Sequence, residues 1–287
     1  MAGEFARSWQ ILKICIDVMK KDKELLLFPL LGGLFSILFI VAIFVPAVVV
    51  GSMLNTTEPG IFEYVVLFLV YLGLSFIATF FNTCAVHTIK TRFEGGNATF
   101  RQSIGFAFSM IHLIFAWSLL SATVGIIFRI LENMAQRMKG VGQILFKLLI
   151  SALGMMWGII TLFVVPAMVY HNLGPIDAIK KSVQTLKKTW GESIIRHFGL
   201  GLAQIVFVVI GIIVGIGLFV LALSLGGYAL MAVIAVIVLY FLCVVLFFGL
   251  ANVIFNTALY VYAETGQVPE GYDKDVMKNA FQPTQPA

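Results

Sequence analysis

Amide and hydroxyl side chains inside the apolar runs of this sequence are the residues most able to do chemistry there. Asn82 and Thr83 are adjacent in one run, Asn252, Asn256 and Thr257 lie close together in another, and Gln204 lies in a third. Polar groups in such runs either bond a neighbouring helix or line a path for a solute. We therefore expect a candidate polar pocket that comprises Asn82, Thr83, Gln204, Asn252, Asn256 and Thr257, and interhelical hydrogen bonding is the simpler interpretation of it.

Residues suited to metal binding or nucleophilic catalysis form no recognisable pattern. The histidines, none of which has another histidine four residues away, are His87, His112, His171 and His197. The cysteines, which include no C-x-x-C pair, are Cys15, Cys84 and Cys243. P-loop, dinucleotide-binding and serine-hydrolase motifs are also missing from the sequence. We therefore expect a protein that is not an enzyme and that has neither a cofactor nor a metal site.

The apolar runs are too long for the core of a soluble protein. From Ser193 to Ala263 the chain is almost entirely apolar, with a break at Ser224–Tyr228. One crossing of a hydrocarbon layer of about 30 Å takes about 20 residues, so this stretch predicts two spans. In lipid, only helices satisfy the backbone of such segments. The six expected helices are Leu25–Gly51, Ile61–Ile89, Ile104–Leu131, Val141–Tyr170, Ile194–Leu223 and Tyr228–Ala263.

The composition agrees with a membrane protein. Of the 287 residues, 60% are hydrophobic and 11% are charged, whereas about 25% are charged in an average globular domain. The sequence therefore predicts an all-α fold, a polytopic membrane helix bundle. We expect a location in the cell (inner or plasma) membrane, with the lipid bilayer as the main partner and no nucleic acid.

Lysine and arginine orient the expected bundle. Only four of the 19 fall on the side opposite the termini, namely Arg129, Arg137, Lys139 and Lys147. Because basic loops stay on the cytoplasmic side, both termini are expected there. The exceptional basic stretch Arg129–Lys147 has two interpretations. Its long side chains either extend to the interface from helix ends or form an outer docking surface for anionic headgroups or a partner.

A short amphipathic helix is expected on the cytoplasmic side before each pair of spans. Apolar residues recur at intervals of three and four in the first of these helices, as Phe5, Trp9, Leu12, Ile16 and Met19, and in the third, as Ile176, Ile179, Val183, Leu186 and Trp190. Such helices lie at the lipid surface, with their basic side toward anionic headgroups. The candidate headgroup contacts are Lys20, Lys21, Lys180, Lys181, Lys187 and Lys188.

A weak internal repeat relates the three pairs of spans. A serine follows a basic residue in each short helix, as Ser8, Ser103 and Ser182, and Phe81-Asn82-Thr83 recurs as Phe255-Asn256-Thr257. This pattern predicts a possible pseudo-threefold repeat of amphipathic helix plus hairpin. The expected single integral membrane domain, 1–287, divides into an amphipathic helix (4–24), a hairpin (25–90), an interfacial turn and second hairpin (97–170), an amphipathic helix (175–190), a third hairpin (193–263) and a cytoplasmic tail (264–287).

Two segments carry a resemblance to a known family. Residues 258–271, which read ALYVYAETGQVPEG, are followed by Lys278-Asn279-Ala280-Phe281, and this end of the chain resembles an uncharacterised family of six-span membrane proteins of bacteria and archaea. The segment from Val165-Pro166 to Trp190 fits the same family. The chain is also distantly similar to the membrane domains of some glycerophosphodiester phosphodiesterases. The resemblance implies topology and location, and it carries no catalytic residues.

Two functions from different classes follow from these features. The first is a non-enzymatic membrane scaffold or accessory subunit that interacts with anionic lipid through its amphipathic helices. The alternative is a transporter or oligomeric pore for an apolar or lipid-like solute, which would use the amides of the candidate pocket. Either function is compatible with a homo-oligomer or a membrane partner subunit.

Overall fold

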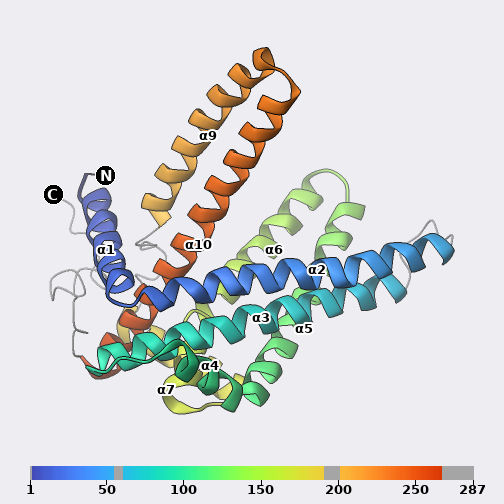
Figure 1. Ribbon diagram of the computed structural model, residues 1–287. Helices are drawn as coiled ribbons and strands as arrows, with labels where there is room; N and C mark the ends of the chain where they lie inside the picture. Colours follow the sequence, from blue (N-terminus) through green and yellow to red (C-terminus); the bar gives the residue numbers. More distant parts are fainter. Residues whose placement is uncertain (1, 55–60, 191–200, 267–287) are drawn as a thin grey trace. The chain divides into compact units, whose positions relative to one another are not determined.

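The structure is a computed structural model that describes residues 2–54, 61–190 and 201–266. Across these ranges the chain is helical and contains no strand, so the all-α prediction is confirmed (Figure 1). The elements are α1 (Ala2–Lys21), η1 (Lys23–Leu26), α2 (Leu27–Leu54), α3 (Ile61–Phe93), α4 (Phe100–Ser109), α5 (Ile111–Arg137), α6 (Val141–Ile160), α7 (Val164–His171), α8 (Pro175–Trp190), α9 (Gly201–Leu225) and α10 (Gly227–Thr265).

Six segments of the described chain are long and apolar enough to cross a membrane. They are Lys23–Val50, Ile61–Phe93, Ile111–Arg137, Val141–His171, Ala203–Ser224 and Gly227–Thr265. These segments confirm the expected polytopic bundle. The expected start of the fifth span, Ile194, lies outside the described residues.

The predicted start of the third span is wrong. A separate helix, α4, occupies Phe100–Ser109, and the span begins after it at Ile111. The Thr99 hydroxyl accepts a hydrogen bond from the Gln102 N–H, and the Gln102 side chain accepts one from the Thr99 N–H, which is a capping box. This cap fixes where the short helix begins. Met110 then departs from helical geometry, with φ −99° and ψ 10°, and separates α4 from α5.

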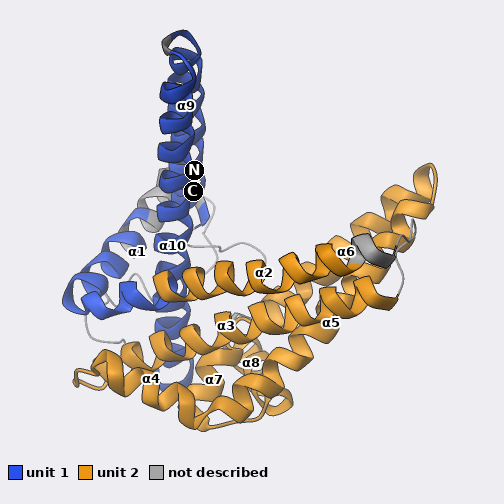
Figure 2. Cartoon of the chain, turned by 45° about the vertical axis from the view of Figure 1, so that its right-hand side comes forward, with its two compact units in different colours: residues 1–29, 189–287 blue, residues 30–188 orange. Residues whose placement is uncertain are grey.

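The described chain forms two compact units, which Figure 2 shows in different colours. Unit 1 contains residues 1–29 and 189–287, and therefore α1, η1, α9 and α10. Unit 2 contains residues 30–188, and therefore nearly all of α2 together with α3 to α8.

In unit 1, α9 and α10 pack as a hairpin through glycine. A Cβ on Gly211 would overlap the ring of Tyr240, so only glycine admits this aromatic side chain. The Tyr240 hydroxyl donates a hydrogen bond to the Phe207 carbonyl, 2.8 Å away. One turn along α9, Gly215 faces Ile237. The Gly211-x-x-x-Gly215 motif is therefore used within this hairpin.

Unit 1 also holds α1 against α10. Ile11 and Cys15, four residues apart on α1, are fully buried. The Cys15 thiol donates a hydrogen bond to the carbonyl of Ala251 on α10, with a sulfur–oxygen distance of 3.6 Å. The first helix of the chain thus packs on its last span.

In unit 2, α3 is the central helix and contacts α4, α5 and α7. Gly125 of α5 lies against the ring of Tyr71 on α3, and Gly73 of α3 lies against Phe39 of α2. The α5–α6 hairpin is joined by parallel stacking of Trp117 on Trp157, with ring centroids 6.1 Å apart.

A polar cluster attaches α4 to α3. Ser103 is fully buried, and its hydroxyl lies 2.7 Å from the Thr88 hydroxyl and 3.1 Å from Nδ1 of His87. The His87 ring stacks on Phe106 of α4 at 4.2 Å between ring centroids.

The fourth span is broken between α6 and α7. Pro166 has no N–H to bond the carbonyl four residues earlier, and its ring clashes with that carbonyl, so the helix is interrupted just before it. The break releases the Phe163 N–H, which donates to the hydroxyl of Ser182 on α8, 3.2 Å away. Because Ser182 is fully buried, this bond secures α8 at the break.

The three short helices therefore repeat one arrangement. Each has a fully buried pair of residues four apart, namely Ile11 and Cys15, Ser103 and Ala107, or Ala178 and Ser182. Each packs on the second span of a hairpin through a small polar side chain. Within two residues of its end, each such span is followed by a residue with positive φ, which is Gly95, Asn172 or Gly266. This recurrence supports the pseudo-threefold repeat.

Candidate functional site

The residues of the expected polar pocket are divided between the two units. Asn82 and Thr83 belong to α3 in unit 2, whereas Gln204 of α9 and Asn252, Asn256 and Thr257 of α10 belong to unit 1. Two of the α10 side chains bond within their own helix. Asn252 Nδ2 donates to the Phe248 carbonyl at 2.9 Å, and the Thr257 hydroxyl donates to the Val253 carbonyl at 2.7 Å. These bonds leave less of the α10 cluster available for a solute.

Asn82 and Thr83 retain buried hydrogen-bonding capacity. Within the described part of the chain, neither Asn82 Oδ1 nor the Thr83 hydroxyl has a hydrogen-bond partner. Thr88, on the same helix, instead donates to the carbonyl four residues earlier, as threonine commonly does in a helix. A buried polar group without a partner costs about 1–3 kcal/mol. Of the expected pocket, Asn82 and Thr83 are therefore the residues with buried, unsatisfied hydrogen-bonding groups.

On α8, three sides of the helix have different surroundings. Ala178, Ser182, Thr185 and Leu186 form a buried side. Roughly a third of a turn around the axis lie the apolar residues Ile176, which is 61% exposed, and Ile179 and Val183, which are half-buried. The remaining side exposes Lys180, Gln184, Lys187 and Lys188. The stripe expected to face lipid is thus divided, because Leu186 is buried against protein whereas Ile176, Ile179 and Val183 stay at least partly exposed beside the buried side.

The same division occurs on α1. Ile11 and Cys15 are buried, and so are Leu12 and Met19 of the stripe expected to face lipid, while Trp9 is exposed and Ile16 half-buried. The exposed polar side carries Lys13, Asp17, Lys20 and Lys21. Lys13, Lys20 and Lys21 lie two residues before, and five and six residues after, the buried Cys15. On α8, Lys180, Lys187 and Lys188 have the same spacing from the buried Ser182. Of the six candidate headgroup contacts, five are exposed and only Lys181 is half-buried.

A cavity of about 520 Å³ brings together two of the histidines. His112 of α5 and His171 of α7 line it, with Tyr170 and Ser109. Lys90 lies 4.9 Å from the centre of the Tyr170 ring. The described residues include no group of three or more His, Cys, Asp or Glu side chains placed to hold a metal ion.

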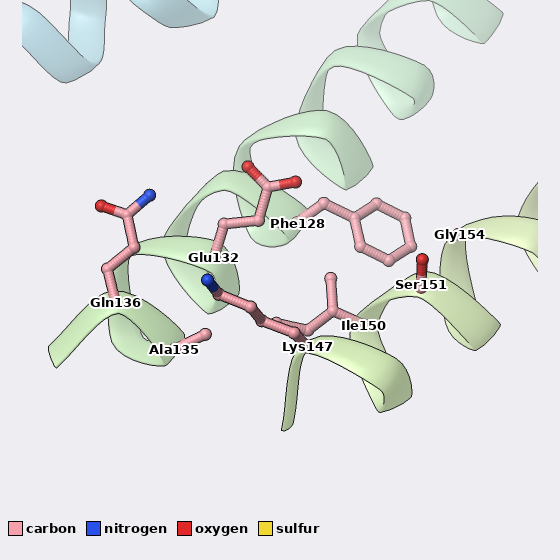
Figure 3. A pocket seen from close by; sticks show the side chains of 8 residues that line it. All are labelled: Phe128, Glu132, Ala135, Gln136, Lys147, Ile150, Ser151 and Gly154. Carbon is pink, nitrogen blue, oxygen red and sulfur yellow. The ribbon is translucent and has the colours of Figure 1, made fainter. Parts of the chain in front are cut away.

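A second cavity, of about 470 Å³, lies between α5 and α6. Figure 3 shows Glu132 and Gln136 on α5, and Lys147 and Ser151 on α6, around this space. The sequence marked the stretch Arg129–Lys147 as unusual because it is basic. It did not indicate that a carboxylate and an ammonium from opposite helices line one cavity, because that requires the register of the hairpin.

The sequence predicts no nucleophile–base pair, but the fold creates a contact between His87 and Ser103. The Ser103 hydroxyl is fully buried and also bonded to Thr88. A nucleophile must reach its substrate, so this geometry fits a structural bond between α3 and α4.

Comparison with known proteins identifies a family but no curated relative. No curated protein matches the chain. A family model does match, over residues 61–270, which include α3 to α10. The matched region contains five of the six apolar segments and two of the three short helices. The chain belongs to this family, which is described as a family of unknown function (DUF6159).

Proposed function

We propose that this chain is a non-enzymatic membrane scaffold or accessory subunit that binds anionic lipid through the basic sides of α1 and α8. The observation that carries the proposal is the division of these two helices into three sides. One side packs on protein, the next is apolar and partly exposed, and the third exposes lysines. A helix at a lipid surface needs an apolar edge toward the acyl chains and cations at headgroup level.

The proposed orientation follows from the same helices. With α1, α4 and α8 on the cytoplasmic side of the cell (inner or plasma) membrane, the lysines face its negatively charged leaflet. Both termini then lie in the cytoplasm. Protease removal of a terminal tag from outside intact cells would contradict this orientation.

Neutralising the exposed lysines of α8 tests lipid binding. In the full-length protein, replacement of Lys180, Lys187 and Lys188 by Gln should weaken binding of phosphatidylglycerol. Each neutralised charge should lower the affinity by up to about fivefold at low salt, since each contributes about 1 kcal/mol near such a surface. Native mass spectrometry of the delipidated protein titrated with phosphatidylglycerol would measure the change.

The matched control neutralises Arg137 and Lys139, which are exposed at the opposite end of a span. It should leave phosphatidylglycerol binding at the α8 surface unchanged. Equal losses from the control and the α8 variant, or no loss from either, would reject the α8 surface as the binding site.

The alternative, a transporter or pore for an apolar or lipid-like solute, is favoured by one observation. Asn82 Oδ1 and the Thr83 hydroxyl are buried without a partner among the described residues, as expected of groups that bond a passing solute or water. Solute flux into vesicles that contain the purified protein, compared with flux for Asn82→Leu, would test this function. Flux that is absent, or unaffected by the replacement, would remove it.

A further inference from the structure

The cavity between α5 and α6 has a mixed lining. Ala135 and Ile150 are buried beneath it, while Glu132, Gln136, Lys147 and Ser151 supply polar groups. In Figure 3 the Lys147 side chain extends from α6 toward the part of α5 that carries Glu132 and Gln136. Its volume of about 470 Å³ lies within the range of about 300–1,000 Å³ usual for ligand pockets.

The charged groups lie at matching depths in the hairpin. Lys147 is six residues after the first residue of α6, and Glu132 is five residues before the last residue of α5. At 1.5 Å per residue, both are roughly 8–9 Å from their helix ends at the turn. The 27 residues of α5 span about 40 Å, about 10 Å more than the hydrocarbon core. With most of this excess at the turn, Glu132 and Lys147 lie near the boundary between the hydrocarbon core and the headgroups.

The surroundings point to a ligand from the bilayer. Ile144, Leu145, Leu148 and Met155 of α6 are each at least 60% exposed, so the cavity is set in a surface that faces acyl chains. A lipid can place its acyl chains along this surface while its headgroup occupies the polar space.

The chemistry of the lining selects the headgroup. Lys147 has no ion-pair partner in the described part of the chain, and its ammonium suits a phosphate. Among the described residues, the ion pair of Glu132 is an exposed one with Arg129, through one carboxylate oxygen at 3.5 Å. Such pairs are weak and exchangeable, so the carboxylate is available to a cation. An anion and a cation on one ligand would satisfy both residues.

We infer that this cavity binds the headgroup of a zwitterionic phospholipid with a primary amine, of the phosphatidylethanolamine type. Lys147 binds the phosphate, and Glu132 accepts a hydrogen bond from the headgroup ammonium. A choline headgroup has no N–H to donate, so it loses this bond. An anionic headgroup such as that of phosphatidylglycerol has no cation to pair with Glu132.

Titration with three lipids tests the assignment. Full-length protein is delipidated in detergent and titrated with phosphatidylethanolamine, phosphatidylcholine and phosphatidylglycerol of identical acyl chains, with binding followed by native mass spectrometry. Phosphatidylethanolamine should bind about tenfold more tightly than phosphatidylcholine, the effect of one hydrogen bond to a charged group. Glu132→Gln should remove this preference, and Lys147→Gln should weaken binding of both lipids.

The control for charge is Lys139→Gln, because Lys139 is exposed near the same turn but does not line the cavity. It should preserve both the affinity and the preference. Equal effects of Lys139→Gln and Lys147→Gln would show that general charge, and not this cavity, attracts the lipid.

A second pair of variants keeps the test independent of charge. A Cβ on Gly154, which lines the cavity, would meet no atom within 4 Å, so Gly154→Leu should fill the space without disrupting the helix. Gly158, with the same open surroundings but outside the cavity, provides the control Gly158→Leu. Gly154→Leu should abolish the phosphatidylethanolamine preference, and Gly158→Leu should keep it.

Two results would overturn the inference. If phosphatidylglycerol binds at least as tightly as phosphatidylethanolamine and depends on Lys147, the cavity is a phosphate site without selection for the amine. If Gly154→Leu leaves binding unchanged, the lipid is bound elsewhere. Neither result bears on lipid binding by the lysines of α8, so the two proposals fail separately.

Discussion

The Ser182 hydroxyl accepts a hydrogen bond from the Phe163 N–H, 3.2 Å away, at the point where the fourth span is broken. Pro166 causes the break, and a residue on the following helix satisfies the backbone group that the break exposes. Pro166 and Ser182 thus act together: the proline interrupts the helix, and the serine bonds the exposed N–H and so attaches α8 to the preceding span.

Removing the hydroxyl should destabilise the protein. We expect Ser182→Ala to lower the free energy of unfolding by about 1–3 kcal/mol, because it removes the hydroxyl that accepts the hydrogen bond of the buried Phe163 N–H. Thermal unfolding of the protein in detergent would measure the loss. Ser109→Ala is the control, because that exposed hydroxyl bonds only to the Phe106 carbonyl of its own helix. Equal losses for the two variants would show that the Phe163 bond is unimportant.

Removing the proline should make the serine less important. In Pro166→Ala the new N–H can bond the Leu162 carbonyl, and a continuous helix gives the Phe163 N–H a partner within its own span. Ser182→Ala should then cost less in the Pro166→Ala background than in the original protein, and a double-mutant cycle would measure this coupling. Additive effects would mean that Pro166 does not create the need for Ser182.

Replacing glycines of α9 by alanine should change the stability of the protein by different amounts at different positions. A Cβ on Gly211 overlaps the Tyr240 ring, one on Gly215 makes ordinary contact with Ile237 at 3.5 Å, and one on Gly217 meets nothing within 4 Å. Gly211→Ala should therefore destabilise the protein most, while Gly217→Ala should be neutral or stabilising by up to about 1 kcal/mol. Thermal unfolding of the three variants gives the order, and a uniform response would contradict the packing at Gly211.

Two threonines of α3 should respond in opposite directions to valine. Thr83→Val removes a buried hydroxyl without a described partner and should leave stability unchanged or raise it by about 1 kcal/mol. Thr88→Val should lower stability, because it removes one of the two partners of the buried Ser103 hydroxyl, the other being His87. Unfolding measurements on both variants check the contrast. Marked destabilisation by Thr83→Val would show that its hydroxyl is bonded in the membrane.

Hydropathy predicted the spans well because the length of an apolar run is itself the physical requirement for crossing a bilayer. The errors occur where hydrogen bonds of polar side chains set the start of a helix or the position of a break. The sequence predicts a third span from Ile104, although Thr99 and Gln102 have the spacing of a capping box and mark a separate helix. Pro166 is itself a sequence signal for the break, and the repeat marks Ser182, but neither pattern indicates that Ser182 bonds the backbone at the break.

Side-chain partners were the least predictable feature. The amides and hydroxyls of α10 looked like a pocket, yet Asn252 and Thr257 bond their own helix, a choice that composition does not determine. The repeat was aligned on Ser8, whose side chain lies outside the described residues, whereas Cys15 makes the contact equivalent to that of Ser182. The likeness to glycerophosphodiester phosphodiesterase membrane domains stays a prediction.

The contact between Cys15 and Ala251 joins residues 236 positions apart in sequence. During synthesis, α1 is therefore made well before the span on which it packs, with α2 to α9 made in between. Its two counterparts, α4 and α8, follow the spans that they contact almost immediately. The packing of α1 on α10 is thus a late step of assembly, whereas α4 and α8 can pack as soon as they are made.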